Sequence, residues 1–194
     1  MNISEKRILP MAGQGQPAEE QTEKTDFQAG KDFLAKGDLA QAALSFHNAL
    51  LAAEETGDQA AVANAAHMLG EVCIQRGDHG TAAGHYERSR DLCAKLEDMF
   101  SALSVEKKMV TALRLDKQFD RAISLSLHLL DTYQDYNNPG SAVAVLEDLS
   151  EIYREKGDVE AAAHALRTAA EIHASFGHAN HAALLRQKAA ALAG

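Results

Sequence analysis

The chain repeats itself with a period of about 40 residues, and this period restricts its fold more than any other feature. Gly-Asp dipeptides lie at residues 37–38, 77–78 and 157–158, and Lys117-Gln118 occupies the remaining position. An alanine lies at the same distance after each of these breaks, and the four alanines are Ala42, Ala82, Ala122 and Ala162. A constant period of this length indicates a stack of equivalent structural units.

Each unit has the pattern of two amphipathic helices joined by a tight turn. Apolar residues recur at spacings of three and four on both sides of each break. Gly37, Gly77 and Gly157 are expected to end one helix in the left-handed conformation, and the following Asp to cap the next helix. Further breaks between repeats are Gly57-Asp58, Glu97-Asp98, Asn137-Asn138 and Gly177-His178. The predicted helices cover residues 24–36, 39–56, 59–76, 79–96, 99–116, 119–136, 141–156, 159–176 and 179–193.

Composition excludes several other classes of protein. The 194 residues are 46% hydrophobic but only 5% aromatic, without Trp, which does not fit an all-β sandwich. Two cysteines cannot form a disulfide scaffold, so we expect a reduced, cytoplasmic protein. The net charge of −9 argues against nucleic-acid binding. No stretch approaches the ~20 apolar residues of a membrane helix, and Ile8-Leu9 before Pro10 is too short for a signal-peptide core.

The domain boundaries follow from the period. Residues 1–22 lack a helical pattern and are expected to form a flexible N-terminal arm. Residues 23–194 are expected to form one solenoid domain. Its repeats are predicted at about 23–58, 59–98, 99–138 and 139–178. The last helix, residues 179–193, has no partner and is expected to cap the apolar end of the stack.

This pattern resembles the tetratricopeptide repeat (TPR), in which a small residue follows Leu in helix A and an Ala lies early in helix B. Repeat 2 carries it in Leu69-Gly70, Gly77-Asp78, Ala82 and Tyr86; repeat 1 has Gly30, Gly37, Ala42, Phe46 and Ala49. The long period is similar to that of kinesin light chain and spindle-orientation adaptor TPRs. Where the family has Trp, this chain has Asp26, Ala66, Glu106 and Leu146, and the small position is Val110 and Ser150 in repeats 3 and 4. The resemblance implies an all-α, right-handed superhelical solenoid.

The resemblance also implies a concave groove that is lined by the first helix of each repeat and holds a peptide. Phe27, Leu34 and Ile74 would bury an apolar anchor, and Lys107 and Arg114 would meet an acidic group. Thr111 stands where chaperone-binding TPRs have Asn, so an EEVD-type C-terminal tail is not expected. The predicted groove residues are Phe27, Lys31, Leu34, His67, Glu71, Ile74, Lys107, Thr111, Arg114, Glu147, Glu151 and Arg154.

Metal binding and catalysis have weaker support in the sequence. His178 and His181 are three residues apart, with His173 on the preceding helix, but structural zinc needs four N or S ligands. No metal and no cofactor is therefore expected. The sequence has no Gly-rich phosphate loop, HExxH or GxSxG motif, so we predict no enzyme activity.

The predicted function is a protein-interaction scaffold or adaptor whose groove binds a peptide or helical segment of an unidentified partner. Two alternatives remain open. One is a self-associating scaffold, a homo-oligomer that uses the arm or the terminal helix. The other is a sensor domain for a small ligand or a metal.

Overall fold

The computed structural model describes the backbone of residues 18–193 and the side chains of residues 26–192. This part of the chain contains nine α-helices and no β-strand. The helices are α1 (Ala18–Ala35), α2 (Leu39–Thr56), α3 (Gln59–Arg76), α4 (His79–Lys95), α5 (Met99–Leu115), α6 (Phe119–Asp135), α7 (Pro139–Lys156), α8 (Val159–Ser175) and α9 (Ala179–Ala193).

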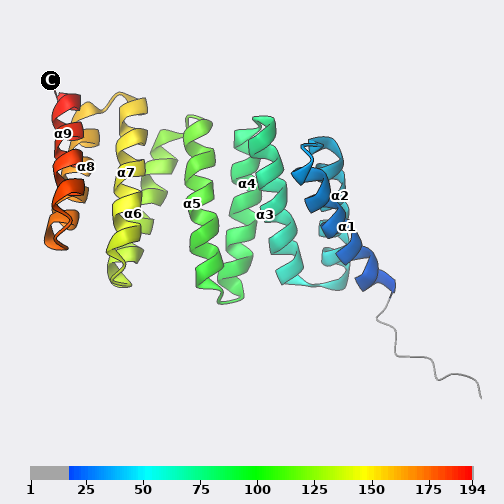
Figure 1. Cartoon of the computed structure of the whole chain (residues 1–194). Helices are drawn as coiled ribbons and strands as arrows, with labels where there is room; N and C mark the ends of the chain where they lie inside the picture. Colours follow the sequence, from blue (N-terminus) through cyan, green and yellow to red (C-terminus); the bar gives the residue numbers. More distant parts are fainter. Residues whose placement is uncertain (1–17, 194) are drawn as a thin grey trace, which may run out of the picture.

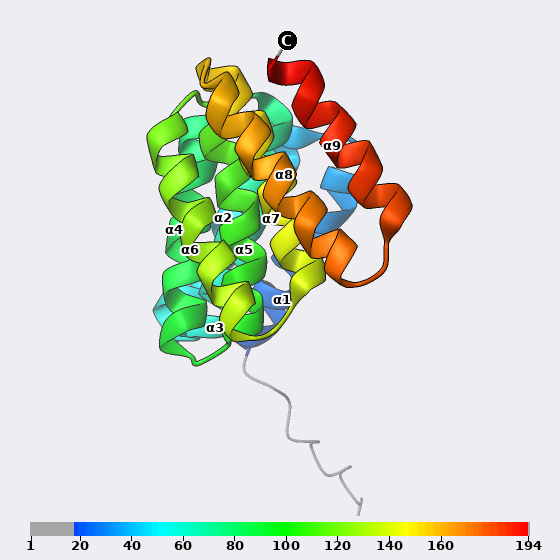
Figure 2. The ribbon, with the colours of Figure 1, turned by 90° about the vertical axis from the view of Figure 1, so that its left-hand side faces the viewer.

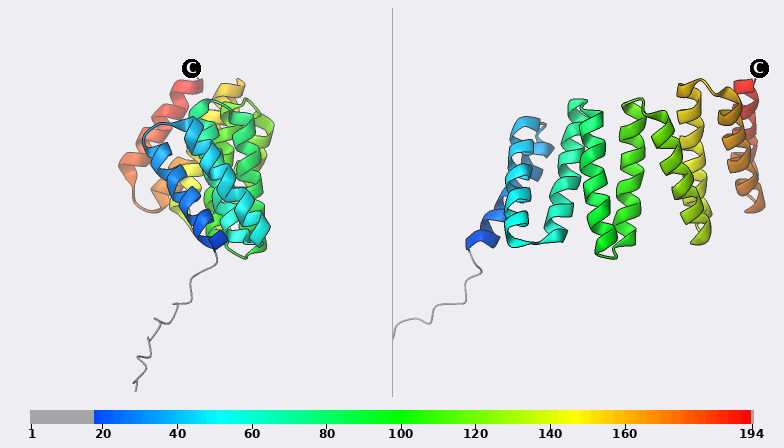
Figure 3. Two further views of the ribbon diagram at one scale, coloured as in Figure 1. Left: turned by 90° about the vertical axis from the view of Figure 1, so that its right-hand side faces the viewer. Right: turned by 180° about the vertical axis from the view of Figure 1, so that it is seen from behind.

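The helices form a single row of antiparallel neighbours (Figure 1). Each helix packs chiefly against the helix before it and the helix after it in the sequence. Viewed along the row, successive pairs overlie one another, and α8 and α9 are inclined to the pairs behind them (Figure 2). The view from behind shows the same row of helices (Figure 3). Because contacts are between sequence neighbours, the stack is the all-α solenoid that the period predicts.

Every connection between these helices contains a residue with positive φ, and these residues are evenly spaced along the chain. Five are glycines, with φ between 75° and 92°: Gly37, Gly57, Gly77, Gly157 and Gly177. The other three are Glu97 (φ 60°), Lys117 (φ 60°) and Asn137 (φ 49°). A left-handed residue after a helix lets the last carbonyl groups accept hydrogen bonds from the turn. The predicted left-handed glycines are therefore confirmed, and the breaks without glycine use the same geometry.

Capping of the following helix is less uniform than the sequence predicts. Asp38 and Asp158 accept hydrogen bonds from the backbone N–H of Gln41 (3.2 Å) and Ala161 (3.0 Å), as expected. Asp58, Asp98 and Asn138 cap the helices that begin new repeats in the same way. The predicted cap at Asp78 is wrong: its side chain makes no capping hydrogen bond. Its carboxylate instead lies 3.6 Å from Nε of Arg76.

The core lies between the helices at the predicted positions. The four repeated alanines are fully buried, at 0% exposure each. The side chain four residues further on is buried in every repeat, although its size varies widely. These side chains belong to Phe46, Tyr86, Ser126 and Leu166. The alanines allow close helix approach, because a larger side chain at that phase would push the helices of a pair apart.

Two helix starts differ from the prediction. Helix α1 begins at Ala18, not at residue 24, so the last part of the predicted arm, residues 18–22, is helical. Helix α7 begins at Pro139, not at residue 141, because proline suits the first turn of a helix. The rest of the predicted arm, residues 1–17, lies outside the described residues. Within the described part, no helix combines the length and the apolar character needed to cross a bilayer.

Candidate binding groove

The first helices of the repeats, α1, α3, α5 and α7, place equivalent side chains side by side. The predicted positions 27, 67, 107 and 147 are one per repeat, and the side chains there differ in kind: Phe27, His67, Lys107 and Glu147. Two of these residues, Phe27 and Lys107, line hollows of equivalent position, two repeats apart. His67, between them, belongs to a polar network described below.

The first hollow lies between α1, the end of α2 and the start of α3, and has a volume of about 440 Å³. Phe27 forms one wall, and its ring also packs edge-on against the buried ring of Phe46, with centroids 5.5 Å apart. The remaining lining is small or polar: Gln28, Ala49, Asp58, Ala60, Ala61 and Asn64.

The second hollow lies between α5, the end of α6 and the start of α7, and is also about 440 Å³. Its lining is mainly apolar and aromatic. Phe100 is 87% exposed, and Lys107 lies two helical turns further along the same face of α5. The lining residues are Met99, Phe100, Leu103, Ser104, Lys107, Tyr133, Tyr136, Asn138 and Ser141.

Sequence reasoning missed Phe100, Leu103 and Tyr136 in this hollow. Phe100 was within reach, because positions 100, 104, 107 and 111 continue one helical stripe toward the start of α5. Tyr136 was not, because it follows the end of α6 and comes from the other helix of the repeat.

Between the two hollows, a polar network centred on Glu71 joins repeats 2 and 3. The Glu71 carboxylate accepts a hydrogen bond from the hydroxyl of Tyr86 at 2.8 Å and from Nζ of Lys108 at 2.6 Å. Nε2 of His67 lies 3.7 Å from the same oxygen. Lys108 is not among the predicted groove residues, yet it is the cation that bridges α5 to α3.

The surroundings set the protonation of this network. Burial pushes the pKa of Glu71 upward, but the hydrogen bonds from Lys108 and Tyr86 outweigh burial, so its pKa lies below the ordinary value. Burial lowers the pKa of His67, and the charge of Glu71 offsets only part of that effect. Burial and the bond to Glu71 raise the pKa of the Tyr86 phenol. Near neutral pH the network is therefore a carboxylate held by one ammonium group and one phenol.

The predicted basic patch of repeat 3 is partly neutralised by repeat 4. Nη1 of Arg114 lies 3.7 Å from the carboxylate of Glu155. Arg154 binds Glu151 on its own helix at 2.6 Å. Lys107 is exposed and forms no ion pair with a side chain among residues 26–192. Lys107 is therefore the cation of this patch that remains open to a ligand.

The other predicted positions divide between the core and the surface. Phe27, Leu34 and Ile74 are half-buried and pack against the core clusters, so they offer less open apolar surface than the sequence suggests. Lys31 and Thr111 are exposed, and the Thr111 hydroxyl donates to the carbonyl of Lys107.

The histidines of the last turn do come together. Nδ1 of His173 lies 3.2 Å from Nδ1 of His178, and the His181 ring centroid is 5.2 Å from that of His173. Within the described residues, however, no three His, Cys, Asp or Glu side chains have a geometry that could hold a metal ion. Cys73 and Cys93 are free, and burial raises the pKa of each thiol, as for cysteines that pack as small apolar residues.

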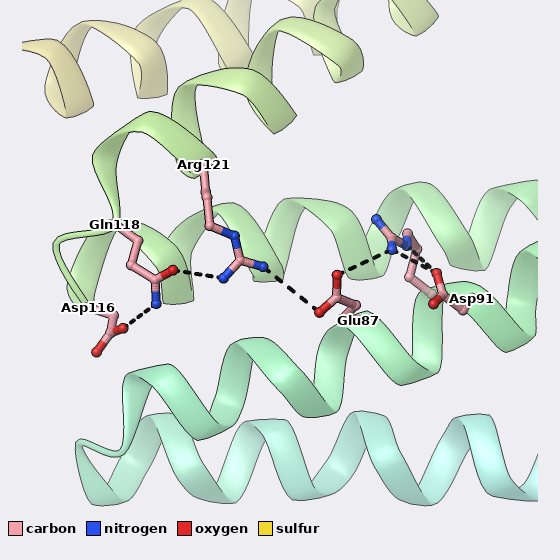
Figure 4. A network of polar contacts seen from close by, with 6 residues as sticks. Glu87, Asp91, Asp116, Gln118 and Arg121 are labelled. Atoms are coloured by element: carbon pink, nitrogen blue, oxygen red, sulfur yellow. Dashed lines mark hydrogen bonds and ion pairs between the residues drawn. The ribbon is translucent and has the colours of Figure 1, made fainter.

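A second polar network lies away from the groove and joins α4 to α6 (Figure 4). Arg121 of α6 donates to the side chain of Gln118 at 2.7 Å and lies 3.9 Å from the carboxylate of Glu87 on α4. Gln118 donates in turn to Asp116. The network bridges neighbouring repeats through Glu87 and Arg121. Because most of these groups are exposed, it contributes little to stability.

Solved structures share this architecture. The putative kinesin light chain nearly identical TPR-like repeats of Podosopora anserina align over 91% of this chain and 93% of that one, with a TM-score of 0.68 and 16% identity. RapI in its apo form aligns over 87% of this chain and 63% of its own, with a TM-score of 0.71 and 15% identity. MamA aligns over 89% and 88%, with a TM-score of 0.60 and 16% identity. The fold is that of a TPR-like helical repeat protein.

At such identities the likeness establishes the TPR-like fold alone. No protein-family model matches the sequence, and no curated protein matches it. A further structure of the same shape is a Rap protein complexed with competence and sporulation factor, with a TM-score of 0.60 and 14% identity. The TPR-like chain spans 56% of the length of that protein.

Proposed function

We propose that the chain is a non-catalytic protein-interaction module. In this proposal, the groove along α1, α3, α5 and α7 binds a peptide or helical segment of a partner protein. TPR-like neighbours in complex with a peptide or factor, such as the Rap regulator of plasmid pLS20 with the Phr* peptide, support this class of function.

The observation that carries the proposal is the pairing of Phe100 with Lys107 at one hollow. An aromatic side chain that is 87% exposed is unusual on a protein surface, and here it lies beside other apolar groups in a concavity. Lys107 is exposed at the same hollow without an ion-pair partner among the described side chains. An apolar cavity with one charged group fixes both the position and the orientation of a ligand.

The recognition follows from these two features. An apolar side chain of the partner enters the hollow against Phe100, Leu103 and Tyr136, and a carboxylate on the same segment reaches Lys107. The helices that form the hollow are already packed, so the protein does not have to order itself when the partner binds. The neighbouring cations Lys108 and Arg114 are held by Glu71 and Glu155, so they keep the groove in shape while Lys107 contacts the ligand.

The test begins with affinity capture from the source cells and mass spectrometry to identify the partner, followed by calorimetry with the purified pair. Phe100→Ser is expected to weaken binding by roughly tenfold or more, as for a central apolar contact. Lys107→Glu is expected to weaken it as well, and more at low salt. The matched controls are Leu44→Ser and Lys36→Glu, which change exposed residues outside the hollow. Full affinity in both groove variants would contradict the proposed site.

Self-association is the alternative function, and one observation favours it. Leu184 on the terminal helix α9 is 50% exposed, so α9 keeps apolar surface beyond what it uses as a cap. Light scattering over a dilution series separates the two functions. A mass equal to the monomer at every concentration contradicts self-association and leaves the groove free for another protein.

A further inference from the structure

A second apolar surface lies along the edge of the solenoid where one repeat passes into the next. The residue at the end of each second helix, or directly after it, occupies this edge, and in three of the four repeats an apolar or aromatic side chain stands there. Leu96, Tyr136 and Phe176 are 44%, 59% and 56% exposed, while Thr56 holds the position in repeat 1. The constant period therefore places these side chains in a row across successive repeats.

The C-terminal part of this edge is hollowed. A cavity of about 260 Å³ lies between the end of α6, the start of α7 and the end of α8, with Phe176, Ile172 and Pro139 among its walls. Tyr133 and Asn138 separate it from the hollow that contains Phe100 and Lys107, and they line both. No charged residue lines this cavity.

The equivalent hollow two repeats earlier has a different chemistry. It lies between α2, α3 and α4, and charged side chains form much of its wall: Glu54, Arg88, Asp91 and Lys95. Glu54 and Arg88 form an ion pair across it. The apolar lining is thus a property of repeats 3 and 4, and the repeat geometry alone does not require it.

Charge distinguishes this edge from the opposite one. Five exposed acidic residues flank the apolar row and form no ion pair with a described side chain; they are Glu97, Asp98, Asp131, Asp135 and Glu171. These acidic residues lie in the segments 95–104, 131–141 and 171–178, and Lys95 is the only Lys or Arg in those three segments. The turns at the opposite edge are mixed in charge, because five cations, Lys36, Arg76, Lys117, Arg121 and Lys156, stand among acidic residues that include Asp38, Asp78, Asp116, Asp120 and Asp158. Acidic groups around an apolar surface attract a partner of opposite charge.

We propose that this edge is a second docking surface, for a partner segment that carries apolar side chains flanked by Lys or Arg. An apolar side chain of the segment enters the cavity against Phe176 and Ile172, and its basic residues face Asp131, Asp135 and Glu171. Two copies of this edge do not pair with one another, because surfaces of the same acidic charge repel. The surface centres on Phe176 and Ile172, which do not line the groove hollow, although Tyr133 and Asn138 line both hollows.

The probe is a pair of synthetic 12-residue peptides with identical Leu and Phe positions, one with Lys and the other with Glu at all remaining positions. Fluorescence anisotropy measures their binding to the full chain. The Lys peptide is expected to bind at least about tenfold more tightly than the Glu peptide, and less tightly as salt rises. Phe176→Ser and Leu96→Ser are each expected to weaken it by roughly fivefold or more. The matched control Leu44→Ser, exposed elsewhere on α2, leaves it unchanged.

Three results would overturn the inference. Equal binding of both peptides contradicts the role of charge, and full binding to Phe176→Ser and Leu96→Ser contradicts the role of the edge. Binding that occurs only after deletion of residues 1–17 would assign the surface to this chain's own N-terminal segment. Circular dichroism confirms that each variant is folded. The two sites can be tested separately. Phe100 lines the groove hollow but not the edge cavity, and Phe176 lines the edge cavity but not the groove hollow, so Phe100→Ser and Phe176→Ser each affect one site.

Discussion

Gly70 of α3 lies directly against the ring of Tyr86 on α4: a Cβ built on Gly70 would be 2.5 Å from Cε1 of that ring. Gly30 has the same relationship to Phe46, at 2.7 Å. The large side chain of the second helix therefore requires the absence of a side chain on the first, and this close approach lets the Tyr86 hydroxyl reach Glu71.

In repeats 3 and 4 the same two positions hold side chains whose sizes compensate for one another. Val110 replaces the glycine where Ser126 replaces the ring, and Ser150 stands opposite the position of Leu166. All four side chains are buried. The departures of repeats 3 and 4 from the TPR pattern are thus explained by volume, because a larger residue on one helix accompanies a smaller one on the other.

Gly70→Ala is expected to lower the free energy of unfolding by about 1–3 kcal/mol, because the ring of Tyr86 has to move away from the new Cβ. Urea denaturation followed by circular dichroism measures the change. Gly84→Ala is the matched control, since Gly84 is also helical but a Cβ placed on it would have no atom within 4 Å. The control should gain stability, because Ala is the better helix former. A neutral effect of Gly70→Ala would mean that the contact is looser than the structure shows.

Transferring the repeat 4 pair into repeat 2 should partly restore packing. Gly70→Ser with Tyr86→Leu reproduces Ser150 and Leu166, so the double variant should lose less stability than the sum of the two single variants, with a coupling of about 0.5–3 kcal/mol. Some loss remains, because Leu cannot donate a hydrogen bond to Glu71. Strictly additive losses would show that the two positions do not share a packing site.

Substitutions at equivalent turn positions of repeats 2 and 3 should change the melting temperature in opposite directions. Gly77 has φ of 81°, and Lys117, at the same position of the next repeat, has φ of 60°. A side chain in this region costs roughly 1–2 kcal/mol, so Gly77→Ala should lower the melting temperature and Lys117→Gly should raise it. The gain is the smaller effect, since glycine also increases the entropy of the unfolded chain. Scanning calorimetry at one pH compares both with the parent protein, and a stabilised Gly77→Ala would contradict the left-handed turn.

Glu106 is a buried ionisable side chain with an unsatisfied polar atom. It is only 7% exposed, and its Oε2 atom has no hydrogen-bond partner. Burial raises the pKa of its carboxyl, and the charges of His128 and Arg90 offset only part of that rise. The folded protein therefore holds this proton more tightly than the unfolded chain does. The stability that comes from this tighter proton binding is fully present below the pKa of the carboxyl in the unfolded chain, about 4.3. It is lost as the pH rises through the pKa of Glu106 in the folded protein.

Glu106→Leu should accordingly stabilise the protein at pH 7–8 by about 1–3 kcal/mol, by removing a buried unsatisfied charge. Leu fits, because Leu146 occupies the same position in repeat 4 and is 5% exposed. The gain should shrink as the pH is lowered, because the raised pKa of Glu106 makes its carboxyl take up a proton at a higher pH than an ordinary glutamate does. Denaturation at several pH values measures this, with Glu55→Leu, an exposed position, as the control. An equal gain at all pH values would point to packing and not to the carboxyl.

Ala122 tests the register in the repeat with the weakest sequence pattern. It lies on α6 and is 0% exposed, so Ala122→Leu should cost about 1–3 kcal/mol through overpacking. Ala144→Leu introduces the same residue at an exposed helical site and should be nearly neutral. The melting temperature distinguishes the two variants, and an unchanged value for Ala122→Leu would contradict the register of this repeat.

The fold was predictable because its determinants are local and repeated. The left-handed turn, the buried alanine and the helical period each depend on residues within one pair of helices, so the sequence pattern reports them directly. The start of α1 at Ala18 was less accessible, because residues 19–22 are polar and the helical state of this segment has no periodic apolar signature.

The site was predictable only in outline. Counting along one helix finds Lys107, but it cannot show that Glu155 of the next repeat approaches Arg114 or that Glu71 binds Lys108. These pairs join residues of successive repeats, where a small rotation between repeats decides which charges meet. The contribution of Tyr136 from a second helix has the same origin, because it depends on how neighbouring pairs pack and not on any single helix.

The constant spacing of the left-handed turns limits how a chain like this can change its length. One inserted residue rotates every later side chain on that helix by about 100°, so the buried alanine would turn toward solvent. An added segment of half a period would reverse the direction of all helices that follow. Only a whole period returns the chain to the same direction and the same face. Duplication or loss therefore acts on whole pairs of helices, and each pair that is gained brings one more section of groove and one more position on the acidic edge.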